Sequence, residues 1–144
     1  MHLSITITHS IFITASPSVV WDFTQDYKKR TNWDHSILEA KVIQHKPFKL
    51  VKIRAKGGLF TELKYKLEDR PNKSSLAMIN VKSFIIQGGG GSWRYEADDS
   101  GTLWTQTNTL IVKKYWILLV PIIKRALVKN TIKGMKRAKQ MIEV

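Results

Sequence analysis

The chain has 144 residues, of which 43% are hydrophobic and 24% charged, a length and balance that fit one folded domain and exclude a disordered chain. It has no cysteine, which excludes disulfides and thiolate metal sites and suits a reducing cytosol, so we expect a cytoplasmic protein. Its net charge of +13 favours contact with anionic surfaces, although a surface that merely favours lysine gives the same total.

The N-terminal part of the chain combines a strand pattern with helix signals. Isoleucines alternate with serine and threonine over residues 3–13, a pattern that predicts a strand. This segment lacks the basic region and the continuous apolar region of a signal peptide. Ser16 and Pro17 are residue types that cap and begin a helix, and apolar side chains then recur at helical spacing. We therefore predict a short helix over about 17–24 and a second helical turn near 27–33.

The middle of the chain predicts a run of strands joined by short loops. The predicted strands cover residues 37–44, 50–56, 59–68, 76–86, 92–97 and 102–112. The clearest is 59–68, where one face is largely apolar and the other largely charged. We interpret the four glycines at 88–91 as a flexible hairpin loop between two strands. Short connections between consecutive strands indicate an antiparallel meander.

From Pro121 onward the sequence has the pattern of one long amphipathic helix, with apolar and small side chains on one side and lysine and arginine on the other. The preceding apolar run, 115–123, is too short for the ~20 residues that a membrane span requires. A helix of about 20 residues is about 30 Å long, enough to lie across a whole sheet. The expected fold class is therefore α+β: about seven antiparallel strands, two short helices after the first strand, and a long C-terminal helix packed across the sheet, in a single domain spanning residues 1–144.

Several short motifs resemble a known superfamily. They are Ala15-Ser16-Pro17, Val20-Trp21-Asp22-Phe23, Tyr27 and Trp33-Asp34, with looser matches at Trp93-Arg94-Tyr95 and Gly101-Thr102. The chain resembles the START-like (SRPBCC) superfamily, specifically its polyketide cyclase/dehydrase and lipid-transport branch. This resemblance implies a helix-grip fold with a cavity between the sheet and the last helix, in which relatives hold lipids, polyketides, hormones or isoprenoids. It implies no catalytic residue, because the superfamily has no universal catalytic motif.

Our leading hypothesis is a non-catalytic protein that binds or transports a small hydrophobic ligand, such as a lipid, an isoprenoid or a polyketide-like molecule. Aromatic side chains on the predicted strands and small or polar residues on the inner helix face suit a mostly apolar pocket with a few polar groups. Ordinary core packing is the alternative interpretation of the aromatics. The candidate ligand-binding residues are Trp33, Tyr65, Trp93, Tyr95, Trp104, Asn108, Asn130 and Thr131.

The second hypothesis is a cyclase/dehydratase-type enzyme acting in the same cavity, which needs an ionisable group such as His35 or Glu39 to point inward. We consider catalysis the less favoured reading and assign no catalytic residue. The four histidines do not pair at helical spacing and no carboxylate cluster joins them, so we expect no metal site and no cofactor. Asp22 and Asp26 are better explained as part of a solvated helix face than as a catalytic pair.

The third hypothesis concerns the basic side of the long helix, where Lys129, Lys133, Lys136 and Arg137 lie together. Such a surface suits a basic adaptor that contacts an anionic membrane or RNA. Peripheral contact with a membrane, with 115–116 as an aromatic anchor, is the favoured form. Nucleic acid is not expected as a partner, because no aromatic side chains interleave with the positive charges on this helix. The sequence indicates no oligomeric state.

Overall fold

The computed structural model describes residues 3–144, so Met1 and His2 lie outside it. Its strands and helices follow the predicted order, with one additional 3-10 helix before the last helix. The elements are β1 (Ser4–Ile13), α1 (Pro17–Thr24), α2 (Arg30–Trp33), β2 (Ile37–Gln44), β3 (Leu50–Ala55), β4 (Leu59–Asp69), β5 (Lys73–Lys82), β6 (Ile86–Asp98), β7 (Gly101–Val112), η1 (Lys114–Leu119) and α3 (Val120–Ile142). The predicted α+β architecture is confirmed.

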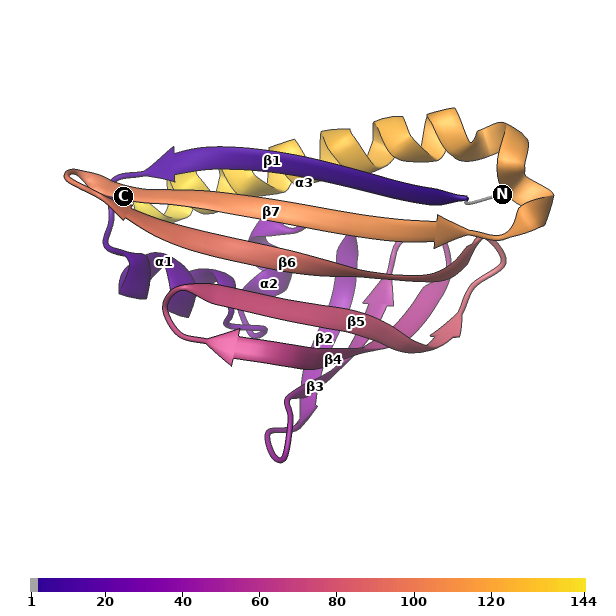
Figure 1. Cartoon of the computed structure of the whole chain (residues 1–144), viewed down its shortest axis with the longest axis horizontal. Coiled ribbons are helices and arrows are strands. Elements are labelled where there is room, and N and C mark those ends of the chain that lie inside the picture. Colours follow the sequence, from indigo (N-terminus) through magenta and orange to yellow (C-terminus); the bar gives the residue numbers. More distant parts are fainter. Residues whose placement is uncertain (1–2) are drawn as a thin grey trace.

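All seven strands form one antiparallel sheet in the order β1-β7-β6-β5-β4-β3-β2. The sheet is strongly curved, and α3 runs beside β1 along its length (Figure 1). Strands β2 to β7 follow one another as a meander, and the last strand, β7, then pairs with the first strand, β1. This topology leaves β1 and β2 as the two edges and encloses a concave space between the sheet and the helices.

The alternation of β1 is explained by its two faces. Ile5, Ile7 and Ile13 are buried in the core, whereas the hydroxyl residues between them face outward. Those hydroxyls meet hydroxyls of β7 directly across the strand pair: Thr6 with Thr109 at 3.0 Å, Thr8 with Thr107 at 3.2 Å, and Ser10 with Thr105 at 2.7 Å between oxygens. Cross-strand pairs of this kind fix the register between β1 and β7.

The start of α1 is set by its capping residues. The Ser16 Oγ accepts a hydrogen bond from the Val19 amide at 3.4 Å, and Pro17 occupies the first helical position, where a missing N–H costs nothing. The predicted bounds of this helix are confirmed. The second helical segment is shorter than predicted, a single turn at Arg30–Trp33.

The prediction of a hairpin loop at residues 88–91 is wrong, because these glycines lie inside β6, where all four pair with β7 and the last two also pair with β5. At Gly89 and Gly90 the backbone of a neighbouring strand approaches so closely that a side chain does not fit. A Cβ added to Gly89 would lie 2.3 Å from the Thr109 carbonyl oxygen, and one added to Gly90 would lie 2.6 Å from the Leu76 carbonyl oxygen. The loop before this strand is 83–85 instead, and β5 begins at Lys73, three residues before its predicted start.

The two halves of α3 are packed differently. All of its buried residues, Thr131, Gly134, Met135 and Ala138, lie in the second half, close to α1 and α2. The first half contributes only partly buried side chains, such as Leu127, to a separate apolar cluster at the η1 end of the sheet. The helix therefore closes tightly over one end of the concave sheet face and stands off from it at the other end.

Candidate functional site

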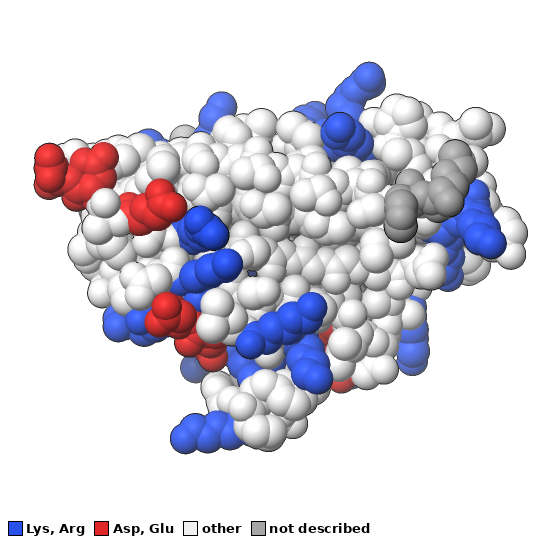
Figure 2. Space-filling model, in the orientation of Figure 1, with Lys and Arg blue, Asp and Glu red and all other residues white. Residues whose placement is uncertain are grey.

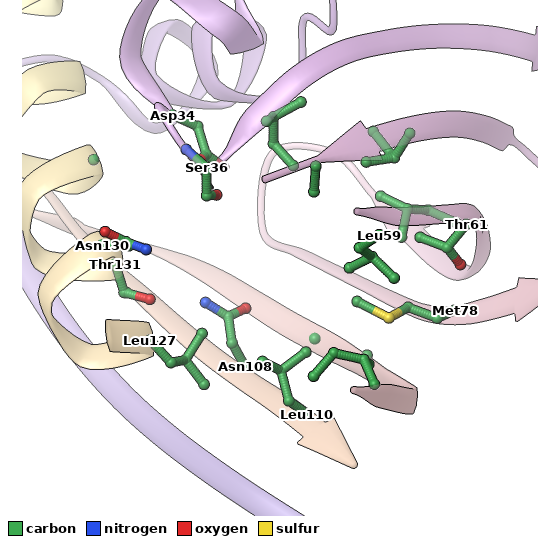
Figure 3. Close-up of a pocket in the computed structure, with 18 of the residues that line it drawn as sticks. Asp34, Ser36, Leu59, Thr61, Met78, Asn108, Leu110, Leu127, Asn130 and Thr131 are labelled. Atoms are coloured by element: carbon green, nitrogen blue, oxygen red, sulfur yellow. Dashed lines mark hydrogen bonds between the residues drawn. The ribbon is translucent and has the colours of Figure 1, made fainter. Parts of the chain in front are cut away.

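A pocket of about 450 Å³ lies between the concave face of the sheet and the first half of α3. Its wall comes from the segment around α2, from strands β2 to β7 and from α3 (Figure 3). Most of the wall is apolar, and a smaller set of polar side chains also lines it. The principal apolar lining residues are Ile37, Ile53, Leu59, Leu63, Leu76, Met78, Ile86, Leu110, Ile123 and Leu127.

The mouth of the pocket lies beside the first half of α3. This side of the mouth is formed by a row of residues spaced one helical turn apart, Ile122, Ala126 and Asn130. Each of them lines the pocket and is also exposed to solvent. Lys56 and Gly57, in the turn between β3 and β4, are exposed lining residues of the facing rim. The stand-off of α3 from the sheet is what keeps this opening free of side chains.

Six of the eight predicted ligand-binding residues lie in the pocket wall: Trp33, Tyr65, Trp93, Asn108, Asn130 and Thr131. Asn108 is held on β7 because its Oδ1 accepts a hydrogen bond from the Trp93 indole N–H at 3.1 Å and its amide donates to Gln106 at 2.7 Å. The Asn130 and Thr131 side chains project from α3 towards the cavity (Figure 3).

The structure places the other two predicted residues, Tyr95 and Trp104, in the core behind the pocket wall. Trp104 is fully buried and packs edge-on against the rings of Trp33 and Trp93, with ring centres 5.6 Å and 5.5 Å away. Tyr95 stacks on Trp104 and meets Trp21 of α1 with ring centres 5.0 Å apart. The curvature of the sheet turns this end of β6 and β7 towards α1 and away from the pocket.

Sequence reasoning missed a buried ion pair in the pocket wall. Arg30, the first residue of α2, donates from its Nε to the Asp34 carboxylate at 2.9 Å, and its side chain is only 11% exposed. The other carboxylate oxygen of Asp34 accepts hydrogen bonds from the hydroxyl and the amide of Ser36 at 2.5 Å and 3.2 Å. The spacing of Arg30 and Asp34, four residues apart, was the available sequence signal.

The Arg30 guanidinium also lies over aromatic rings of the wall. Its central carbon is 4.8 Å from the ring centre of Trp33, 4.6 Å from that of Trp93 and 5.6 Å from that of Tyr27. Burial lowers the pKa of Arg30, but the charge and hydrogen bond of Asp34 together with the neighbouring Tyr27 and Tyr65 outweigh this, and the net pKa is raised above its ordinary value. The pocket therefore contains a permanently charged group whose position is fixed from several sides.

A chain of buried hydrogen bonds underlies the pocket floor. The Tyr27 hydroxyl meets the Tyr65 hydroxyl at 2.5 Å, and Tyr65 donates to the Gln25 Oε1 at 2.7 Å. The Gln25 amide nitrogen donates to the Tyr95 hydroxyl at 2.9 Å and to Ser74 at 3.0 Å. Because Tyr95 accepts from Gln25, its own proton is left for the Thr24 hydroxyl 2.7 Å away. Each member of this network is satisfied by the next, which is the condition for burying polar groups without loss of stability.

The tyrosines of this network remain neutral. Burial raises the pKa of Tyr65 and of Tyr95 well above the usual range for phenols. Neither hydroxyl therefore ionises near neutral pH, and both are already engaged within the protein. The arrangement holds α1 and the segment after it against β4 and β6, and supplies no free general base.

Comparison with known proteins places the chain in a family. The family model described as polyketide cyclase / dehydrase and lipid transport matches residues 4–139. The chain belongs to this family. This match confirms the predicted resemblance to the polyketide cyclase/dehydrase and lipid-transport branch of the START-like superfamily, and the chain shares its fold with solved structures that include a START superfamily protein. A search of curated proteins found no match.

Three solved structures illustrate the likeness. The Zhui aromatase/cyclase from Streptomyces sp. R1128 has a TM-score of 0.82 at 11% identity, with 97% of this chain and 94% of that chain covered. A START superfamily protein from Mycobacterium smegmatis has a TM-score of 0.77 at 11% identity, with 96% of this chain and 97% of that chain covered. The di-domain ARO/CYC BexL from the BE-7585A biosynthetic pathway has a TM-score of 0.79 at 16% identity, with 99% of this chain and 51% of BexL covered. The chain thus spans about half of that di-domain protein, and at these identities the likeness shows the fold alone.

In this member of the polyketide cyclase / dehydrase and lipid transport family, the ionisable residues weighed from the sequence lie outside the pocket. His35 is exposed, and Glu39 is exposed and paired with Arg54 at 2.9 Å. Asp22 forms a two-pronged ion pair with Arg70, whose hydrogen bonds lower the Asp22 pKa. Within residues 3–144, no three histidine, cysteine, aspartate or glutamate side chains lie together as a metal site requires.

Proposed function

We propose that this family member is a non-catalytic carrier that binds a small hydrophobic ligand in the pocket between the sheet and α3. The single observation that supports this most strongly is an apolar cavity of about 450 Å³ with an open mouth. Known small-molecule sites have this size and composition, namely a largely apolar wall with a few convergent polar groups. The absence of cysteine supports a cytoplasmic location for such a carrier.

The predicted residues take distinct roles in this proposal. Trp33, Tyr65 and Trp93 supply apolar contact with the ligand, and the polar side chains of Asn108 and Asn130 orient its polar end, assisted by Thr131. Tyr95 and Trp104 act indirectly, because they support Trp33 and Trp93 from behind.

Native mass spectrometry of protein purified without detergent tests the carrier function. We expect a bound species of defined mass that disappears on denaturation and is recovered by organic extraction. The experiment then adds Nile red, a neutral apolar dye, to protein stripped by extraction. Failure to find any bound species, together with no uptake of the dye by the stripped and refolded protein, would contradict the carrier function.

A cyclase/dehydratase-type reaction in the same pocket is the second candidate function. The observation that favours it is the ionisable pair Arg30 and Asp34 in the wall, because acid–base chemistry requires such groups within reach of the ligand. Both carboxylate oxygens of Asp34 are engaged by Ser36 and Arg30, which favours the carrier function. A ligand that is recovered with its mass and spectrum unchanged after long incubation with the protein would argue against catalysis.

We further propose that the η1 end of the carrier contacts an anionic membrane. Four large apolar side chains are exposed there: Phe84 at 88%, Tyr115 at 91%, Leu118 at 89% and Ile122 at 60%. A hydrogen bond connects the loop at residues 83–85 to η1, because the Trp116 indole N–H donates to the Phe84 carbonyl at 2.8 Å. Trp116 itself is partly buried, so Tyr115 takes the anchoring role that the sequence assigned to both.

The charges around this apolar end suit an acidic lipid surface. Lys82, Lys114, Lys124 and Arg125 are exposed near it, and no aspartate or glutamate occurs from Gly101 to Ile142. On the face shown in Figure 2, the acidic side chains gather mainly towards the end opposite η1. In the part of the chain that the structure describes, no helix is long and apolar enough to cross a bilayer. The predicted basic residues Lys129, Lys133, Lys136 and Arg137 are all exposed and extend the same charge along α3.

Vesicle co-sedimentation tests the membrane contact. We expect binding to vesicles that contain phosphatidylserine, little binding to pure phosphatidylcholine, and loss of binding as salt rises well above physiological ionic strength. Replacing Tyr115 and Leu118 with serine should weaken binding, whereas Thr8→Ser on the hydroxyl face of β1 should not. Equal binding to neutral and anionic vesicles would contradict the proposal, as would binding to RNA but to neither vesicle.

A further inference from the structure

Arg30 occupies an unusual place in the pocket. A guanidinium has five N–H donors. Of the five donors of Arg30, only the one on Nε has a hydrogen-bond partner within residues 3–144. Its two terminal nitrogens have none, and they are not among the fully enclosed side-chain atoms of residues 3–144 that lack a partner, so they face space that solvent or a ligand can occupy. Because the side chain as a whole is 89% buried and lines the cavity, an acceptor group of a ligand held there can bind these donors.

The guanidinium is held in place before any ligand binds. Its Nε donates to Asp34, Ser36 holds Asp34 by a further hydrogen bond, and the rings of Trp33 and Trp93 lie next to the guanidinium. A planar, preoriented fork of this kind matches the two oxygens of a carboxylate. Lysine at the same position would supply a point charge without the fork.

The charges of the lining favour an anion over a cation. The charged side chains that line the pocket are Arg30, Lys56 and Asp34, two cations and one carboxylate. Asp34 is paired with Arg30, so the surplus positive charge is that of Lys56, which is exposed at the rim and screened by solvent. Recognition of an anionic group inside the pocket therefore depends on the terminal N–H donors of Arg30, and Lys56 adds only a general attraction at the mouth.

The polar side chains of the pocket are concentrated towards one end. Asp34, Ser36, Asn130 and Thr131 lie on one side of the cavity, Leu59, Met78 and the single hydroxyl of Thr61 lie on the other, and Leu127, Asn108 and Leu110 lie between them (Figure 3). The apolar lining residues belong to the apolar cluster at the η1 end of the sheet, which includes Leu59, Met78, Leu110 and Leu127 among its partly buried members. A molecule with an anionic head and an apolar tail fits this gradient in one orientation only.

We infer that the ligand is an apolar monocarboxylic acid whose carboxylate binds the terminal nitrogens of Arg30 and whose tail extends towards Met78 and Leu110. The inference rests on the proposed carrier function and specifies its ligand class. Arg30 is then the residue that determines specificity, and Asp34 and Ser36 position it.

Displacement of Nile red by dodecanoic acid and by dodecanol tests this inference, because the two compounds share a tail and differ in the head. At pH 8, where the acid is ionised, we expect the wild type to bind the acid at least about tenfold more tightly than the alcohol. The double variant Arg30→Met/Asp34→Asn removes both charges of the pair and keeps the apolar stem at position 30, so it avoids leaving a buried carboxylate alone. It should bind both compounds equally. Lys28→Met, an exposed neighbour outside this pocket, should keep the wild-type preference within about twofold.

The possible outcomes separate the two proposals. A wild type that takes up Nile red but binds acid and alcohol equally overturns the role of Arg30 and leaves the carrier function standing. The same conclusion follows if the double variant, folded by circular dichroism, keeps the preference for the acid. A wild type that takes up neither Nile red nor either compound refutes the carrier function and the ligand class together. The single variant Arg30→Lys should retain part of the preference, since it keeps the charge and loses the fork.

Discussion

Replacing Gln25 with leucine should cost about 2–4 kcal/mol of unfolding free energy, the largest stability effect that we expect from a single change in the polar network. Gln25 is 7% exposed and is the link between the two halves of the network, because its oxygen accepts from Tyr65 and its nitrogen donates to Tyr95 and Ser74. Leucine fills similar space but takes the Gln25 hydrogen bond away from each of those three buried hydroxyls, of which Tyr65 and Tyr95 keep one other partner each. Urea denaturation, with the midpoint and the slope compared between variants, measures the loss.

Tyr27→Phe is the matched control for this prediction. The Tyr27 hydroxyl lies at the end of the network and, within residues 3–144, bonds only to Tyr65, so its removal leaves the Gln25 bonds intact. We expect a loss of about 0.5–1.5 kcal/mol, clearly smaller than that of Gln25→Leu. If the two variants lose the same stability, or if Gln25→Leu unfolds at the wild-type urea concentration, the order of hydrogen bonds described above is wrong.

Replacing Ala126 with tryptophan should lower the affinity for Nile red by about tenfold or more, equivalent to ~1.4 kcal/mol of binding free energy. Ala126 is an exposed residue of α3 that also lines the pocket, between Ile122 and Asn130 in the row along the mouth. A large side chain there obstructs the opening without disturbing buried contacts. Fluorescence titration with Nile red measures the affinity, and thermal unfolding should show little change in stability.

Lys129→Trp is the control for this substitution, because residue 129 is exposed on the same helix but does not line the pocket. It adds the same indole and should leave the affinity for Nile red unchanged. Wild-type affinity in Ala126→Trp would show that the ligand enters elsewhere or binds outside the pocket. Equal losses in both variants would indicate binding on the surface of α3.

The order of the elements could be predicted because it depends on local patterns. The alternation of Ile5, Ile7 and their hydroxyl neighbours, and the cap formed by Ser16 before Pro17, are signals within a few residues of the elements that they specify. The glycines at 88–91 misled the prediction because glycine normally marks a turn. Their place in β6 depends on the close approach of β5 and β7, which are distant in the sequence.

The pocket was less accessible to sequence reasoning than the fold. Inward-facing positions such as Trp93 and Asn108 follow from strand alternation, but alternation cannot tell pocket from core. Tyr95 has the same orientation on β6 as Trp93, and the curvature of the sheet places it beneath α1 instead. Arg30 was overlooked because a charged residue in a short polar segment normally faces solvent, and only the packing of Trp33 and Trp93 around it makes it part of the wall.

The most direct test of a ligand held between sheet and helix is NMR of protein labelled with ¹³C at its methionine methyl groups, titrated with dodecanol. Met78 lines the pocket, whereas Met135 is fully buried in the core beneath the second half of α3 and does not line it. We predict that the Met78 resonance shifts in proportion to the bound fraction and that the Met135 resonance moves little. Saturable binding of dodecanol with an unchanged Met78 resonance would contradict a ligand site in this pocket.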